Sequence, residues 1–152
     1  MLRKLMQTDE HAGMLIVRLA LGIVMFPHGA QKMLGWFGGQ GFAATMHGMT
    51  GMGLPAVVVF LVICCEFFGS LALIFGFLGR LGALGILAVM LGAVFTVHLH
   101  NGFFMNWMGN QKGEGYEYHL LAIGFALAVL VKGSGSLSID RAFSDKSRYY
   151  MR

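Results

Sequence analysis

The chain has 152 residues, of which 57% are hydrophobic and only 12% are charged. A soluble domain carries about 25% charged residues, so this chain has too few of them to cover a globule in water. The composition therefore excludes an ordinary soluble protein and predicts that lipid surrounds much of the chain. The net charge is +4. Its basic residues lie between and beyond apolar segments rather than in one patch, which argues against nucleic acid as a partner.

Four apolar segments predict a single all-α domain, a bundle of four transmembrane helices. The segments cover residues 13–32, 55–78, 81–100 and 117–131. A helix needs about 20 residues to cross the hydrocarbon core of a bilayer, and the fourth segment has the shortest apolar stretch. Small residues spaced four apart favour close contacts between helices in lipid. The pairs with this spacing are Ala72 and Gly76, Ala88 and Gly92, and Gly124 and Ala128.

The lysine and arginine residues predict the orientation of the helices. Eight of them fall in the N-terminal segment, in the turn after the second helix and in the C-terminal segment. Only Lys32 and Lys112 fall on the opposite side, and Arg18 lies within the first span. Basic residues favour the cytoplasmic side of a membrane. We therefore expect both termini to be cytoplasmic, with residues 133–152 as a basic tail suited to docking or to anionic lipid.

Two charged residues lie inside apolar segments, where each costs about 2.5–3.5 kcal/mol at the centre of the bilayer. Glu66 lies midway along the second segment, and Arg18 lies in the inner half of the first. Two interpretations remain open. The residues form a structural ion pair, or Glu66 handles protons or binds a ligand.

Polar residues also gather at the predicted outer ends of the helices. His28 and Lys32 end the first span, His98 ends the third, and Glu117 begins the fourth. A helix bundle would bring these residues together at its outer end, which we call the outer mouth, with Glu66 deeper in the membrane. We therefore expect a single polar pocket there. Its candidate catalytic groups are Glu66, His28, His98 and Glu117. Its candidate ligand-binding residues are Arg18, Lys32, Trp36, Asn101 and Phe103.

The sequence offers no metal or cluster motif. Cys64 and Cys65 are adjacent within an apolar segment, which favours two small buried thiols over a redox pair. There is no C-x-x-C-H sequence for haem attachment and no set of four cysteines for an iron–sulfur cluster. His98 and His100 point in different directions on a helix, so they would not chelate one metal there.

Several motifs resemble the DoxX family of small bacterial membrane proteins, over about residues 13–140. They are RLALGIVMFPHGAQKMLGWFGG from Arg18, GLP from Gly53, CEFFGSLALIFGFLGRLGAL from Cys65, TVHLHNGFF from Thr96 and GYEYHLL from Gly115. The resemblance implies a four-helix bundle in the bacterial cytoplasmic membrane. The family takes its name from a subunit of a thiosulfate:quinone oxidoreductase. The motif positions that carry over are Arg18, His28, Gly29, Lys32, Glu66, Arg80, His98, Asn101, Gly102 and Glu117.

Three functions fit these observations. The first is a redox-complex subunit that binds quinone at the outer mouth and receives electrons from a redox partner protein. The second is a membrane anchor or assembly partner for other proteins. The third is a conductor of protons or small solutes, for which four short spans leave little room unless the chain forms a homo-oligomer.

Overall fold

The computed structural model describes residues 6–8 and 11–149, and side chains as far as Ser144. These residues form helices and connecting turns, without a strand. The helices are α2 (Ala12–Leu34), α3 (Gly41–Gly51), α4 (Ala56–Phe75), α5 (Gly79–Ala93), the π-helix η1 (Val94–His98), the 3₁₀-helix η2 (Leu99–Asn101), α6 (Glu117–Lys132) and α7 (Ile139–Tyr149). Three helical runs are long and apolar enough to cross a membrane, namely α2, α4 and the continuous run Gly79–Asn101.

Each of the four predicted segments corresponds to an observed helix, and their bounds differ by a few residues. The fourth, α6, has 16 residues and is the shortest of the four runs. Two further helices lie where the sequence suggested only a loop and a tail. They are α3, built from a glycine-containing segment, and α7, in which apolar and charged residues alternate with helical spacing.

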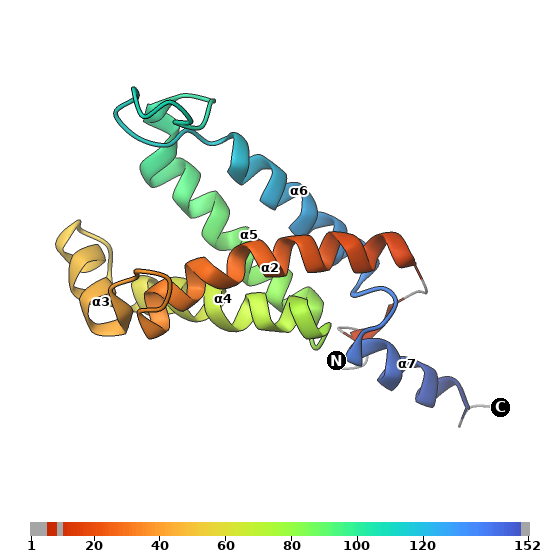
Figure 1. Ribbon diagram of the computed structural model, residues 1–152. Coiled ribbons are helices and arrows are strands. Elements are labelled where there is room, and N and C mark those ends of the chain that lie inside the picture. The colour runs from red at the N-terminus through yellow and green to blue at the C-terminus, as the bar shows by residue number, and fades with distance from the viewer. Residues whose placement is uncertain (1–5, 9–10, 150–152) are drawn as a thin grey trace.

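The four apolar helices form two pairs (Figure 1). Helix α2 lies beside α4, and α5 lies beside α6. Contacts of α4 with α5 and of α2 with α6 join the pairs, which diverge toward α3 and residues 102–116. We call that side the loop end, and the opposite side, with residues 76–79 and α7, the tail end. The core lies where the pairs meet, and comprises Leu21, Met25, Leu73, Ala83, Ile86, Val89, Met90, Ala122, Ala126 and Val129.

Glycines allow close contacts between helices, and one of these contacts involves Ala72 of the predicted pairs, whose Cβ would lie 2.9 Å from a Cβ built at Gly82. A Cβ atom at Gly29 would lie 2.6 Å from backbone atoms of Glu66 and Phe67, and one at Gly82 would lie 2.8 Å from the carbonyl oxygen of Gly69. These contacts join α2 to α4 and α4 to α5. The expected contacts at Gly92 and Gly124 are wrong, because a Cβ atom built at either position would meet no atom of a described neighbouring helix within 4 Å.

Arg18 ties the tail end together. The residue is 1% exposed, and its guanidinium donates hydrogen bonds to the carbonyl oxygens of Leu73 and Ile74 in the last turn of α4. It also donates to three carbonyls of the segment after α6, those of Ser134, Ser136 and Leu137. The last carbonyls of a helix lack partners within the helix and carry partial negative charge. Arg18 therefore neutralises the end of α4 and fixes the residues that follow α6.

Asp140 performs the complementary role at the start of α5. The residue is also 1% exposed, and its carboxylate accepts hydrogen bonds from the backbone N–H groups of Leu78 and Gly79 and from the Ser134 hydroxyl. Negative charge stabilises the N-terminus of a helix, where N–H groups have no partner in the helix. Residues 133–140 are thus packed into the tail end of the domain, and α7 begins from this anchored segment.

Candidate functional site

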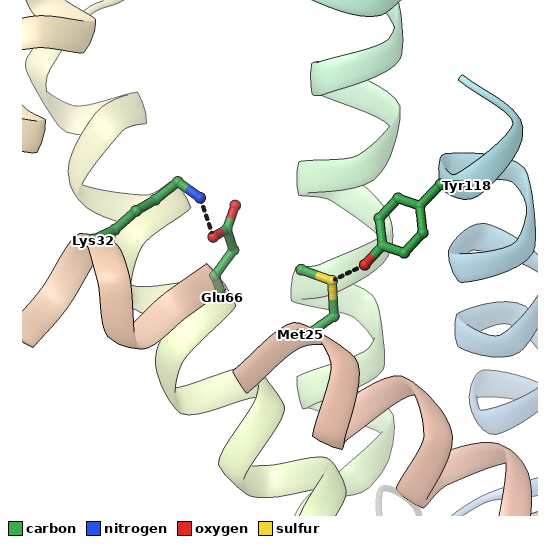
Figure 2. A network of polar contacts seen from close by, with 4 residues as sticks. All are labelled: Met25, Lys32, Glu66 and Tyr118. Atoms are coloured by element: carbon green, nitrogen blue, oxygen red, sulfur yellow. Dashed lines mark hydrogen bonds and ion pairs between the residues drawn. The ribbon is translucent and has the colours of Figure 1, made fainter. Parts of the chain in front are cut away.

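An ion pair lies between α2 and α4, toward the loop end. The Lys32 ammonium donates a hydrogen bond of 2.5 Å to Oε2 of Glu66, and Figure 2 shows the two side chains pointing toward each other. Glu66 is only 4% exposed. Gly29 permits this contact, because its missing side chain lets α2 approach the α4 backbone at Glu66. A buried carboxylate is stable in lipid only when it is paired or protonated, and Lys32 supplies the pairing.

Arg18 is therefore not the partner of Glu66, and the interpretation of these two residues as an ion pair is wrong. The Arg18 guanidinium turns toward the tail end and binds five carbonyl oxygens. Lys32 is nearer to Glu66 because it lies at the loop end of α2, whereas the carbonyls at the end of α4 offer Arg18 several partners at once.

A row of four rings extends from α2 through α6 to η1. The ring centroids of His28 and Tyr118 are 6.3 Å apart, those of Tyr118 and His119 are 5.5 Å apart, and those of His119 and His98 are 4.1 Å apart. The Tyr118 hydroxyl donates to the sulfur of Met25 at 3.3 Å, which links α6 to α2. His28 lies one helical turn before Lys32 on α2, so the row begins beside the ion pair and the two form one polar region.

The π-helix determines how His98 faces this row. Residues Val94–His98 are wound more loosely than an α-helix, and such π segments are frequent at functional sites. The Nδ1 atom of His98 lies 2.8 Å from the Glu114 carbonyl oxygen, and its ring packs against that of His119 with the two ring planes tilted by 40°. His100 is exposed on the 3₁₀ turn and takes no part in the row.

His119 belongs to this region although the sequence analysis did not assign it to the site. It is buried, and its Nδ1 atom has no hydrogen-bond partner. A buried polar atom without a partner costs free energy, so it calls for an explanation such as a role in binding or proton transfer. The spacing of His119 with Ala122, Ala126 and Val129 places all four on the buried face of α6. That helical spacing was the available signal for its burial.

Several predicted site residues lie outside the polar region. Oε1 of Glu117 accepts hydrogen bonds from the backbone N–H of Met105 and from Nε1 of Trp107. The amide of Asn101 donates to the Glu114 carbonyl. Both residues thus shape the 102–116 loop. Phe103 also belongs there, with its ring against Tyr116.

Trp36 is 55% exposed beyond the end of α2 and meets Phe37 edge-on. His28, Lys32, Glu66 and His98 are the predicted residues that the fold brings to the polar region.

An apolar groove of about 750 Å³ lies elsewhere, between α4 and α5. Cys64 and Cys65, both free thiols, line it together with side chains from both helices and Ile139. No residue of the ion pair or of the ring row lines this groove. Among the described residues, no group of three or more histidine, cysteine, aspartate or glutamate side chains is arranged to hold a metal ion.

A family model described as DoxX matches residues 13–99, which include nearly all of α2, the Lys32–Glu66 pair and His98. The chain belongs to the DoxX family. It is similar to "Inner membrane protein YqjF" of Escherichia coli (strain K12), with 32% identity over 141 residues that cover 93% of this chain and 99% of the relative. It is also similar to "Putative oxidoreductase CatD" of Bacillus subtilis (strain 168), with 30% identity over 135 residues, or 89% of this chain and 90% of the relative.

No solved structure matches the DoxX chain. The family match, the inner-membrane relative and the three long apolar helices together identify a multi-pass protein of the bacterial inner membrane. Its outward faces agree with this location. Large apolar side chains, among them Ile16, Phe60, Phe68, Leu84, Phe95 and Leu121, are exposed along the helices and suit contact with lipid.

Proposed function

We propose that this DoxX protein is a membrane subunit of a redox complex and binds quinone beside the Lys32–Glu66 pair. The observation that carries the proposal is the polar region itself. A buried ion pair and a row of one phenol and three imidazoles lie within apolar helices. Polar and ionisable groups are costly inside a membrane and are usually kept there for function. The relative named as an oxidoreductase supports a redox role.

The chemistry of quinones matches these groups. Reduction of a quinone to a quinol consumes two electrons and two protons. The Lys32 ammonium and the Tyr118 hydroxyl can donate hydrogen bonds to the quinone carbonyls, and the Lys32 charge stabilises negative charge on the reduced ring. Glu66, His119 and His98 can pass protons to the reduced ring, as positioned carboxyl and imidazole groups do in general acid catalysis.

The electrons in this proposal come from a redox partner protein, because the sequence carries no haem-attachment or iron–sulfur motif. Exposed apolar residues at the tail end, Leu137, Ile139 and Phe143, offer a surface on which such a partner can dock. That the chain forms homo-oligomers remains a prediction.

The proposed topology has four membrane spans, α2, α4, the run Gly79–Asn101 and α6, with both termini in the cytoplasm. The distribution of lysine and arginine supports it, since Arg80, Lys132 and Arg141 lie at the tail end and basic residues favour the cytoplasmic side. Arg3, Lys4 and Arg152 support the same orientation and lie outside the described residues. The loop end then faces outward.

The deciding experiment is to purify the protein in mild detergent and to quantify the quinone extracted with it. We expect bound quinone in the wild type and its loss in Glu66→Gln. The amide oxygen of glutamine can still accept the Lys32 hydrogen bond, so the fold should survive, and the melting temperature checks this. His100→Gln, outside the ring row, should retain the quinone. Equal quinone content in Glu66→Gln and wild type, or none above that of an unrelated membrane protein, would refute the proposal.

A further inference from the structure

The 102–116 loop exposes large apolar side chains at its tip. Trp107 is 83% exposed, Met108 is 86% exposed and Phe104 is 67% exposed. Exposed apolar groups that cluster on one loop mark a surface that contacts something other than water. Tryptophan and tyrosine are enriched where a membrane meets water, and Tyr116 stands at the end of the same loop.

The loop is folded by its own hydrogen bonds. Glu117 accepts from the backbone of Met105 and the indole of Trp107. Glu114 accepts from the backbone of Asn106 through its carboxylate, and its carbonyl accepts from Asn101. The loop ends are joined by backbone bonds from Tyr116 and Glu117 to the carbonyls of Gly102 and Phe103. Irregular backbone survives at membrane depth only where its polar groups have partners, and this loop provides many of them internally.

The length of α6 indicates the depth at which the loop lies. Its 16 residues extend about 24 Å at 1.5 Å per residue, whereas the hydrocarbon core is about 30 Å thick. Lys132, the last residue of α6, belongs at the water boundary of the tail end. The start of α6 at Glu117 then falls short of the opposite boundary, and the loop bonded to it begins within the outer leaflet.

We propose that residues 102–116 form a loop that inserts into the interfacial region of the outer phospholipid leaflet. Phe104, Trp107 and Met108 contact the upper acyl chains, and Lys112, exposed on the same loop, extends to the lipid phosphates. This inference rests on the part of the proposed topology in which α6 crosses the membrane, and it is independent of quinone. The occupant of the tip is lipid, because the apolar tip and the adjacent lysine match the acyl chains and the anionic phosphate of one molecule.

The chain has only two tryptophans, Trp36 and Trp107, so Trp36→Phe leaves Trp107 as the sole tryptophan. The experiment reconstitutes this variant in phosphatidylcholine vesicles whose acyl chains carry bromine either near the glycerol backbone or near the methyl end. We expect Trp107 fluorescence to fall most with bromine near the glycerol backbone, and to be quenched less by aqueous acrylamide than N-acetyltryptophanamide is. Strong acrylamide quenching with no loss from brominated lipid would overturn the proposal.

Three further variants make the result specific. Phe68→Trp, in a protein without the native tryptophans, reports the lipid-facing side of α4. Its quenching by the deep bromine shows that the helices span the bilayer, so a failure of insertion and a failure of the loop proposal can be told apart.

In the Trp107 reporter, Glu117→Ala removes the acceptor of two loop hydrogen bonds and should increase acrylamide quenching. Gln111→Ala should not increase it, because the Gln111 side chain makes no hydrogen bond to the residues that the structure describes. Equal quenching in these two variants would contradict the role of the loop's internal bonds.

Discussion

At the scale of single residues, Arg18 and Asp140 stabilise two helix ends that meet at the tail end. The arginine binds the last carbonyls of α4, and the aspartate binds the first N–H groups of α5. Each charge is of the sign that the helix terminus attracts. Both side chains also bond to Ser134, in the segment that follows α6. Two residues thereby join α2, α4, α5 and the segment leading to α7.

Arg18→Leu should destabilise the protein strongly, because it leaves five carbonyl oxygens without their donor. We expect a loss of about 3 kcal/mol or more in the free energy of unfolding. Denaturant titration in detergent, followed by circular dichroism, measures it. Lys112→Gln, on the exposed part of a loop, is the control and should unfold like the wild type. An Arg18→Leu protein as stable as this control would show that the carbonyls find other donors.

Lys32→Met should also destabilise the protein, because it leaves the Glu66 carboxylate buried without its partner. The expected cost is about 3–5 kcal/mol. The double variant Lys32→Met with Glu66→Leu should recover much of that loss, since apolar side chains can replace a buried ion pair. Melting temperatures of the two variants in one detergent provide the comparison. A double variant no more stable than Lys32→Met would mean that the pair does more for the fold than neutralise Glu66.

At the scale of helices, close approach depends on which glycines face a neighbour. Gly29 lies against the α4 backbone, whereas Gly124 has no atom near its missing side chain. Both lie inside helices and are indistinguishable by residue type. Their positions relative to the packed faces decide their roles, because only a glycine at a crossing point allows two backbones to come together.

Gly29→Ala and Gly124→Ala should therefore have opposite effects. The alanine methyl group at position 29 would lie 2.6 Å from α4 backbone atoms, which forces the helices apart and should cost about 1–3 kcal/mol. At position 124 the methyl meets nothing, and alanine should stabilise the helix by up to about 1 kcal/mol. Thermal unfolding of both variants in the same detergent tests this. Similar melting temperatures for Gly29→Ala and Gly124→Ala would mean that the close contact between α2 and α4 does not depend on Gly29.

At the scale of the whole molecule, the two helix pairs meet at the core and diverge toward the loop end (Figure 1). The polar region lies toward that diverging side, and the charge-rich α7 lies at the opposite end. In the proposed topology, this arrangement places the candidate site near one membrane surface and the candidate docking surface near the other.

The proposed orientation can be tested by labelling from outside the cell. In a Cys64→Ser, Cys65→Ser background, Gln40→Cys at the loop end should react with a membrane-impermeant maleimide in intact cells. A fluorescent reporter that folds only in the cytoplasm should be active when fused after Arg152. The physical reason is the excess of basic residues at the tail end, which favours the cytoplasmic side. A silent reporter together with an unlabelled Gln40→Cys variant would contradict the proposed orientation and indicate the opposite one.

The sequence by itself determined the membrane class, the four apolar segments, the family and the cost of burying Glu66. These follow from local hydrophobicity and motif spacing, which need no knowledge of neighbours. The spacing of Arg18, Gly22, Met25 and Gly29 puts them on one face of α2, and the structure has all four buried. A helical repeat fixes which residues share a face.

The tertiary structure decided which partners those faces meet. It paired Glu66 with Lys32, directed Arg18 to carbonyl oxygens and brought His119 against His98. It also turned Glu117 into an acceptor for the 102–116 loop. None of these contacts is local in the chain, except within that loop. Each depends on the rotation and crossing of helices, which side-chain packing over the whole domain determines and which the spacing of residues along one helix does not encode.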